Sequence, residues 1–491
     1  MESSQERKRT SSGRELPGAR TLANEDTPNV GPRRKSVNGP FVPIRVLFLQ
    51  PRAVGEESRR EPPRPDPFLS RSNNPLMSTP DSASSSPAVN GEAAPGSSTW
   101  DAEAFAPPDY FDVDDLLSDE ARAVRDEVRA FVTEEVVPVI EGYAQRAEFP
   151  DSLIPAFADL GLLGPNLPPE YGGGGHSNVV YGLMMQEVER GDSALRSFCS
   201  VTGSLVMYPI WQYGTEAQKE RWLPRLARGE AVGCFGLTEP EVGSNPAQMQ
   251  TRARRDGGDW VLTGHKRWST NATIADVAVI WAKDEEGGVR GFLVETDRAG
   301  VSTPPIDDTW SLRAAVTSEV VLDDVRVPDA NRLSGVEGLK GPLSCLTQAR
   351  YGICWGTVGA AMACYDAARQ HARNRTQFGK AIGGFQLVQE RLVEMVQAIT
   401  KAQLLNWRLG TLKDEGTMRP QQVSLAKRNN CEMALEVARS ARQVLGGNGV
   451  TSQYPVMRHM ANLESVITYE GTHEVHTLVV GQDVTGENAF T

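Results

Sequence analysis

The sequence predicts an α+β multidomain protein with a helical part, a small β part and a C-terminal helical bundle. Apolar residues recur at helical spacing in residues 106–233 and again in residues 336–491. Between these parts, residues 234–335 change to short β-rich runs separated by turn residues. A chain of 491 residues is long enough for several domains, each with its own core.

Residues 1–105 are rich in Ser, Pro, Gly and Arg and have no apolar periodicity. Segments such as residues 61–67 and 78–98 cannot bury enough apolar surface to offset chain entropy. We therefore expect a disordered N-terminal extension. A mitochondrial transit peptide is the alternative, but acidic residues such as Glu2 and Glu6 are unusual in such peptides.

In the first helical part, Ser118 is a good N-cap for a helix that has acidic residues in its first turn. Further helices are expected at residues 153–163, 181–189 and 215–226. In the β part, strands are expected at residues 260–263, 276–282, 290–295 and 319–322, with a hairpin connection at residues 284–288.

Long helices are expected in the C-terminal part, and Gly446 and Gly447 would end the third of them as C-cap residues. The expected helices span residues 342–374, 385–415, 420–445 and 456–481. Such helices with short connections favour an antiparallel four-helix bundle, which is a common platform for packing subunits together.

Composition excludes several classes of protein. The chain has 51 basic and 63 acidic side chains, which argues against nucleic acid as the main partner. Its six scattered cysteines include no CxxC pair and are expected to be reduced core residues. No run reaches the roughly 18 apolar residues that span a bilayer, so no membrane insertion is expected. We expect a cytoplasmic protein if the source is bacterial, or alternatively a protein of the mitochondrial matrix.

Residues 468–474 carry the strongest chemical signal. Glu470 lies between Tyr469 and Gly471, just before an expected helix. Packing against an aromatic ring would raise the pKa of Glu470 by desolvation, which suits a general base near neutral pH. Gly471 permits close approach of a ligand, and Thr472 is a good N-cap. From these residues alone, the alternative is a solvated carboxylate before a capped helix.

Two stretches of the β part could hold a flat heterocycle. Glycines in residues 235–244 expose backbone groups, and Thr238 offers a hydroxyl. Trp268, Ser269 and Thr270 add an aromatic plane and two hydroxyls. The alternatives are an ordinary linker and a core tryptophan.

Other candidate motifs are weaker. Arg375 lies between two expected helices and could pair with a pyrophosphate, or could be an ordinary surface arginine. Residues 443–449 are rich in glycine but do not form GxGxxG after a strand, so no Rossmann site is expected. His473 and His476 are three residues apart, whereas the zinc-protease motif needs four, so no metal site is expected.

Together these stretches resemble the acyl-CoA dehydrogenase family over about residues 110–491. FGLTEP followed by GS, the Trp268 motif, RTQFG, QVLGGNG and YEGT occur in family order and at family spacing. Within the family, the chain is most similar to the glutaryl-CoA dehydrogenases. The stretches with this second similarity are residues 195–197, 233–240, 311–314, 349–353, 427–431 and 469–473.

The resemblance implies an FAD-dependent enzyme in which Glu470 removes the α-proton of an acyl-CoA thioester while the β-hydride passes to FAD. The Glu470 amide and a ribityl hydroxyl would stabilise the thioester oxygen. The cofactor-binding residues implied in one subunit are Phe235, Gly236, Leu237, Thr238, Gly243, Ser244, Trp268, Ser269 and Thr270. Those implied in a neighbouring subunit are Arg375, Gln386, Gln443, Val444, Leu445, Gly446 and Gly447, and Thr472, His473 and Glu474 would also lie near FAD.

The resemblance also implies a dicarboxylyl-CoA substrate, because Arg196 and Ser197 match the residues that bind its far carboxylate. Burying that carboxylate requires a paired cation. Glu189, expected on the same helix as Arg196, matches a family acid near this arginine. The alternative for Arg196 is a surface residue at a helix end. The remaining substrate residues implied are Ser244, Leu343, Ser344, Cys345, Leu346, Thr347, Gln348, Ala349, Arg350, Gly471 and Phe490.

The reaction implied is oxidative decarboxylation of glutaryl-CoA to crotonyl-CoA and CO2, as in lysine and tryptophan catabolism. The implied assembly is a homotetramer, and the implied electron acceptor is an electron-transferring flavoprotein. The alternatives are a short-chain acyl-CoA dehydrogenase without decarboxylation, an acyl-CoA oxidase and an inactive scaffold. The chain departs from the family at Ser269, at Glu474 and at Leu343-Ser344, the last of which leaves the fine acyl preference open.

Overall fold

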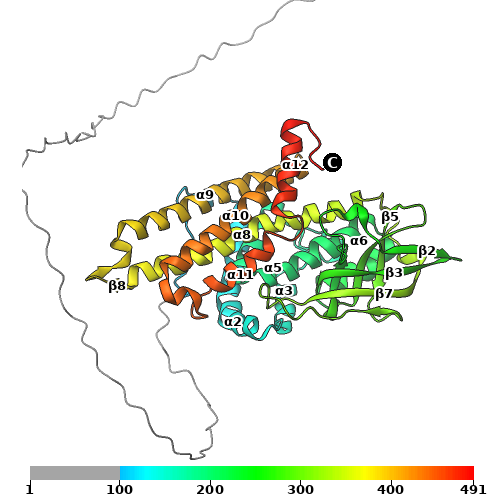
Figure 1. Ribbon diagram of the computed structural model, residues 1–491, viewed down its shortest axis with the longest axis horizontal. Helices are drawn as coiled ribbons and strands as arrows, with labels where there is room; N and C mark the ends of the chain where they lie inside the picture. Colours follow the sequence, from blue (N-terminus) through cyan, green and yellow to red (C-terminus); the bar gives the residue numbers. More distant parts are fainter. Residues whose placement is uncertain (1–99, 491) are drawn as a thin grey trace, which may run out of the picture. The chain divides into compact units, whose positions relative to one another are not determined.

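The computed structural model describes residues 100–490. Its elements run in the predicted order of helices, β-sheet and helices, which confirms the predicted fold class (Figure 1). The predicted disordered extension lies outside the described residues, except for residues 100–105. Phe105 packs against the core of the C-terminal part, and the Asp101 N–H donates to Gln370 at 2.9 Å. Residues 100–105 are therefore attached to the folded part of the chain.

The N-terminal part is helical, and Ser118 caps its first helix by accepting from the Ala121 N–H at 3.1 Å, as predicted. Its helices are α1 (Asp119–Phe131), α2 (Val137–Arg146), α3 (Ile154–Asp159), α4 (Asn178–Gly191), α5 (Ser193–Ser200), α6 (Tyr208–Tyr213) and α7 (Glu216–Ala227). Asp192 is extended and its side chain caps α5, accepting from the Ala194 N–H at 2.7 Å. Glu189 and Arg196 therefore lie on two helices, and the prediction of one helix was wrong.

The β part is a single sheet with strand order β1-β4-β2-β3-β7-β6, in which β5 pairs with β4. The strands are β1 (Gly233–Gly236), β2 (Arg252–Asp256), β3 (Asp259–Thr270), β4 (Val277–Lys283), β5 (Val289–Glu295), β6 (Val301–Ser302) and β7 (Thr317–Pro328). The predicted hairpin joins β4 to β5. The sequence did not predict β1, β2 and β6, which are short and, in β2, mostly charged.

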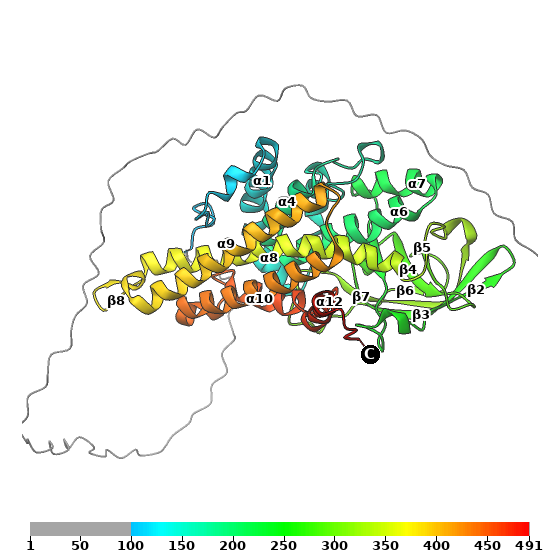
Figure 2. The same cartoon turned by 90° about the horizontal axis from the view of Figure 1, so that it is seen from above.

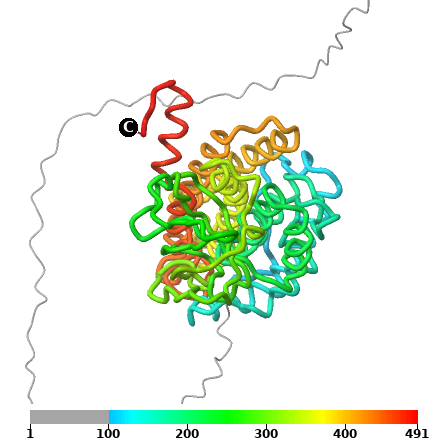
Figure 3. Tube along the Cα trace, turned by 90° about the vertical axis from the view of Figure 1, so that its right-hand side faces the viewer, coloured from blue at the N-terminus to red at the C-terminus, as the bar shows by residue number. Residues whose placement is uncertain are grey.

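The C-terminal part contains α8 (Lys340–Asn374), α9 (Gln386–Asp414), α10 (Pro420–Val444), α11 (Val456–Val466) and α12 (His473–Thr485). A hairpin of β8 (Thr376–Gln377) and β9 (Lys380–Ala381) joins α8 to α9. The predicted helix at residues 456–481 is two helices, because Glu470 and Gly471 have φ of 53° and 99°, which a helix cannot contain. After this break, α12 projects away from the bundle (Figures 1 and 3).

Glycines bring α4 and α8 close together. A Cβ at Gly359 would collide with the backbone carbonyl of Gln186, and one at Gly356 would collide with the Glu189 carboxylate. Gly182 on α4 faces the ring of Trp355 in the same way. The N-terminal helices and the bundle therefore share one core, and α5 contacts the loop between α11 and α12 through Arg196 and Tyr469.

All six cysteines lie in the described part of the chain, and each is buried and unpaired, as expected. Between residues 100 and 490, no helix combines the length and the apolar character that crossing a membrane requires.

Candidate active site

Glu470 lies on the loop between α11 and α12, and cationic side chains hold three consecutive carbonyls of this loop. The Lys427 Nζ of α10 donates to the Tyr469 and Gly471 carbonyl oxygens at 2.6 and 2.7 Å. The Arg350 Nε of α8 donates to the Glu470 carbonyl oxygen at 2.6 Å. The loop is thus anchored to two helices of the bundle.

Thr472 ends this loop and caps α12, as predicted. Its hydroxyl accepts from the Val475 N–H at 3.2 Å. His473 begins the helix partly exposed, and Glu474 is exposed. His476, one turn into α12, is buried against Gly471, and burial together with Lys427 and Arg350 lowers its pKa to about 2. His476 is therefore a neutral packing partner of the loop.

The Glu470 carboxylate has the electrostatics of a general base. Its Oε2 is buried and has no hydrogen-bond partner among residues 100–490. Burial raises the pKa of Glu470, and the nearby charges of Arg196, Lys427 and Arg350 oppose this increase without cancelling it. A carboxylate with a raised pKa and a free oxygen can accept a proton near neutral pH, as the sequence predicts.

Arg196 is 0% exposed, so the alternative of a surface arginine was wrong. Its Nε donates to Glu189 Oε2 at 2.6 Å, and Ser193 Oγ donates to Glu189 Oε1 at 2.8 Å. Burial lowers the pKa of Arg196, but Glu189, Tyr469 and Glu470 raise it more, so that the guanidinium stays charged. Arg196 also donates to the Tyr469 hydroxyl, which lies 3.4 Å from Ser197 Oγ.

Tyr469 therefore connects the buried cation to the candidate base, because it contacts Arg196 with its hydroxyl and precedes Glu470 in the chain. Glu189 already balances the charge of Arg196. A ligand anion at this place would be bound by directed donors from Arg196, Tyr469 and Ser197 rather than by an excess of positive charge. Such donors select a carboxylate over an apolar group.

The structure brings together the two predicted cofactor stretches of the β part. The Arg267 N–H donates to the Thr238 carbonyl oxygen at 2.9 Å, which places Thr238 beside Trp268. Trp268 has φ of 63° and is 53% exposed. Gly243 and Ser244 are exposed and Thr270 partly so, whereas Phe235, Gly236, Leu237 and Ser269 are buried. The cofactor role predicted for these four buried residues stays a prediction.

The cofactor residues predicted in the bundle lie elsewhere. Arg375 precedes the β8–β9 hairpin, which is drawn at the opposite end of the described part from β2 and β3 (Figures 1 and 2). Gln386 begins α9. Here Arg375, Gln386, Gln443, Gly446 and Gly447 are exposed, while Val444 and Leu445 are buried. A single chain does not bring these residues to Trp268.

The predicted substrate residues between 343 and 350 occupy the first turns of α8. Leu343 is exposed, and Ser344, Leu346, Thr347 and Gln348 are partly exposed. Ser344 Oγ lies 2.7 Å from the Tyr213 hydroxyl. Cys345 and Ala349 are fully buried, and Arg350 is turned toward the Glu470 loop. Phe490 is exposed in the segment after α12.

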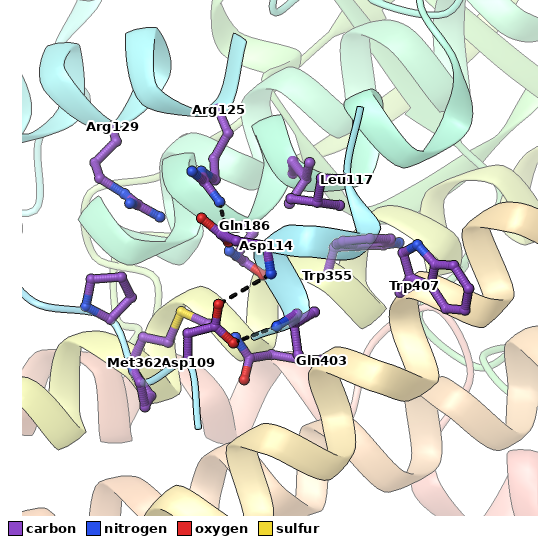
Figure 4. Close-up of a pocket in the computed structure, with 14 residues that line it drawn as sticks. Asp109, Asp114, Leu117, Arg125, Arg129, Gln186, Trp355, Met362, Gln403 and Trp407 are labelled. Atoms are coloured by element: carbon purple, nitrogen blue, oxygen red, sulfur yellow. Dashed lines mark hydrogen bonds and ion pairs between the residues drawn. The ribbon is translucent and has the colours of Figure 1, made fainter. Parts of the chain in front are cut away.

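A small cavity of about 60 Å³ lies between the N-terminal segment and α1, α4, α8 and α9 (Figure 4). Asp109, Asp114, Arg125 and Trp355 are among its lining residues. None of the residues predicted for catalysis, substrate or cofactor lines this cavity. It is therefore separate from the candidate active site.

Three residues of the site were missed or only partly interpreted from sequence. Lys427 lies on the same helical face as the buried Val423 and Cys431, and a lysine on an apolar face was an available signal. Gly356, inside a long helix, was a signal of close approach. The Tyr469 hydroxyl as a partner of Arg196 had no signal, because only the fold brings them together.

Family models for the N-terminal, middle and C-terminal domains of acyl-CoA dehydrogenases match residues 118–230, 234–325 and 337–485. The mitochondrial short-chain specific acyl-CoA dehydrogenase of Bos taurus is 33% identical over 370 residues, which are 74% of this chain and 90% of that protein. The crystal structure of glutaryl-CoA dehydrogenase from Mycobacterium smegmatis is 51% identical with a TM-score of 0.76, and covers 77% of this chain and 97% of its own. Another structure of a glutaryl-CoA dehydrogenase from that organism, in complex with FADH2, is 49% identical with a TM-score of 0.78, and covers 79% of this chain and 100% of its own.

Proposed function

The chain belongs to the acyl-CoA dehydrogenase family, and we propose that it is an FAD-dependent glutaryl-CoA dehydrogenase that forms crotonyl-CoA and CO2. One observation carries the choice of substrate. Arg196 is fully buried, paired with Glu189 and hydrogen-bonded to the residue before Glu470. The end of a monocarboxylyl chain is apolar and would lie against these polar groups. Such contact is unfavourable unless every one of the polar groups keeps a hydrogen-bond partner.

The residues of the β part fit FAD. Trp268 presents an exposed ring on a residue with positive φ, directly beside Thr238. A non-glycine residue in this conformation is uncommon and is typical of functional sites. Trp268, Thr238 and Ser244 would hold the cofactor, which when bound accepts the hydride from the β-carbon of the acyl chain. The FADH2 in the similar glutaryl-CoA dehydrogenase supports this assignment.

Glu470 would take the α-proton onto its carboxylate. The backbone N–H of Glu470 would donate to the thioester oxygen, where negative charge develops. At the far end of the acyl chain, Arg196, Ser197 and the Tyr469 hydroxyl would bind the second carboxylate. Oxidation makes that carboxylate vinylogous to the thioester, so its loss as CO2 leaves electrons that the thioester can accept. The protonated Glu470 is then available to return a proton.

The two sets of predicted cofactor residues also favour an oligomer. The β8–β9 hairpin, which follows Arg375, is drawn far from the sheet whose strand β3 contains Trp268, which favours a cofactor site shared by two chains (Figures 1 and 2). We propose the homotetramer that the family resemblance implies, with an electron-transferring flavoprotein as acceptor. A purified protein that is yellow and oligomeric supports this proposal, whereas a monomer that cannot be reconstituted with FAD contradicts it.

A short-chain acyl-CoA dehydrogenase without decarboxylation is the second candidate, favoured by the similarity to the bovine enzyme. Anaerobic mixing with glutaryl-CoA or butyryl-CoA, while flavin absorbance and CO2 are followed, separates the two. Preferential bleaching by glutaryl-CoA with release of CO2 supports the first proposal. Preferential bleaching by butyryl-CoA without CO2 from glutaryl-CoA supports the second. Peroxide formation in air would indicate an acyl-CoA oxidase.

A further inference from the structure

The backbone of Glu470 has a conformation that the residue would not adopt alone. Its φ of 53° lies in the left-handed region, which is unfavourable for a glutamate. Such a residue persists only where its surroundings impose the conformation, and residues of this kind gather at functional sites. Glu470 therefore needs neighbours that hold the peptide groups on both of its sides.

Two cations hold these peptide groups. Arg350 holds the one after Glu470 through the Glu470 carbonyl oxygen, whereas the one before Glu470 and the one after Gly471 are held by Lys427. The single ammonium group of Lys427 donates to the carbonyl oxygens before and after Glu470, those of Tyr469 and Gly471, at 2.6 and 2.7 Å. Lys427 is 1% exposed, and no described carboxylate lies within ion-pair distance of its Nζ. The amino group is thus used for two backbone carbonyls, although burial lowers the pKa of Lys427.

This arrangement also fixes the direction of the loop N–H groups. In a trans peptide the C=O of one residue and the N–H of the next point in opposite directions. Because the Tyr469 carbonyl faces Lys427 and the Glu470 carbonyl faces Arg350, the N–H groups of Glu470 and Gly471 point away from these cations. Neither N–H donates to another residue in the part of the chain that the structure describes.

We propose that Lys427 is a positioning residue that sets both the carboxylate and the backbone N–H of Glu470 for the same ligand. The proposal rests on the proposed function, because it takes Glu470 as the base. Lys427 itself touches neither substrate nor cofactor in this scheme. It acts by keeping the left-handed conformation and by turning the loop carbonyls away from the ligand.

The test compares Lys427→Met, Lys427→Arg and Lys413→Met in the FAD-loaded protein. Lys413 is a matched control, because its amino nitrogen is also buried but has no hydrogen-bond acceptor among the described residues. We expect Lys427→Met to lower the limiting rate of flavin bleaching about 10²-fold with glutaryl-CoA and with butyryl-CoA, since a misplacement of about 1 Å has an effect of this size. Lys427→Arg, which can still donate to two carbonyls, should recover part of the rate.

Binding measured by calorimetry separates positioning from general damage. Acetoacetyl-CoA is a 1,3-dicarbonyl compound that forms an enolate readily, and the enolate oxygen would accept from the Glu470 N–H, so its Kd should rise about 10-fold or more in Lys427→Met. An acyl-CoA analogue with a thioether in place of the thioester has no such oxygen, so its Kd should change less than about 3-fold. Equal weakening of both ligands, or equal effects of Lys427→Met and Lys413→Met, would overturn the proposal.

If Lys427→Met does not fold, Lys427→Gln retains one donor and should show a smaller but clear loss in both measurements. A wild-type rate in Lys427→Gln would then overturn the proposal. Glu470→Gln distinguishes this failure from failure of the proposed function. If Glu470→Gln keeps its rate, the assignment of the base is wrong. If it loses its rate while Lys427→Met does not, only the role of Lys427 is refuted.

Discussion

Replacing Arg196 by Gln should reduce turnover of glutaryl-CoA far more than turnover of butyryl-CoA. Arg196 is 0% exposed, so a substrate carboxylate beside it would be equally shielded from water. Removing one partner of a buried charged pair is destabilising by about 3–5 kcal/mol, which corresponds to a factor of a few hundred or more. Butyryl-CoA has no second carboxylate, and its kcat/KM should therefore change little through this effect.

The same substitution also leaves Glu189 without its arginine. Because Glu189 is buried and its Oε2 lies 2.6 Å from Arg196 Nε, the single variant will lose stability whichever substrate is used. The double variant Glu189→Gln with Arg196→Gln removes both charges and serves as the control. We expect the double variant to recover thermal stability and butyryl-CoA turnover, but not glutaryl-CoA turnover.

The assay is anaerobic stopped-flow bleaching of the flavin with each substrate, expressed as the ratio of the two kcat/KM values. A fall of about 10²-fold or more in this ratio, in both variants, supports binding of the far carboxylate by Arg196. An unchanged ratio would refute the glutaryl-CoA assignment, while the acyl-CoA dehydrogenase family would still hold.

Two other substitutions have three defined outcomes. Glu470→Gln should keep FAD and substrate binding and lose flavin bleaching by about 10²–10⁴-fold, because only proton abstraction is removed; near-normal bleaching would place the base elsewhere. Burial raises the pKa of Glu470 above its ordinary 4.5. The contribution of Glu470 to the free energy of unfolding of the wild type is therefore fully present below pH 4.5 and is lost as the pH rises through the higher pKa of the folded state. Glu470→Gln should therefore be more stable than the wild type near neutral pH and equal to it in acid, as thermal unfolding across pH can measure; a constant difference would contradict the raised pKa. Gly356→Ala places a methyl group against the Glu189 carboxylate and should lower glutaryl-CoA turnover more than FAD content, which parallel kinetics and flavin absorbance can check; equal losses would indicate general misfolding.

The sequence predicted the parts of the fold that local patterns determine. The Ser118 cap and the β4–β5 hairpin depend on neighbouring residues only, and both are present. The break between α11 and α12 was predicted only in part: Thr472 was identified as an N-cap, but residues 456–481 were still predicted as one helix, because apolar residues continue at helical spacing on both sides of the break. What ends the helix is the positive φ of Glu470, and distant side chains on α8 and α10 stabilise that conformation.

The candidate site shows the same division. Sequence motifs predicted Glu470 and Arg196 separately. The two are connected by the hydrogen bond between Arg196 and Tyr469, which are 273 residues apart in the sequence. The pairing of Arg196 with Glu189 was expected on one helix and instead crosses the break at Asp192. Sequence patterns thus identified the reactive residue types, whereas only the packing of the helices shows which donors face one another.

The glycine contact between α4 and α8 limits how the acyl specificity of this protein can change in evolution or by engineering. Backbone groups of the two helices already touch at Gly359, so neither helix can move inward, and any side chain at Gly356 displaces Glu189. The α5 side is different, because Ser200 at the end of α5 and Ser204 in the segment after it have small, buried side chains. Variants with new chain-length preference should therefore arise on the α5 side, while the glycines of α8 stay unchanged.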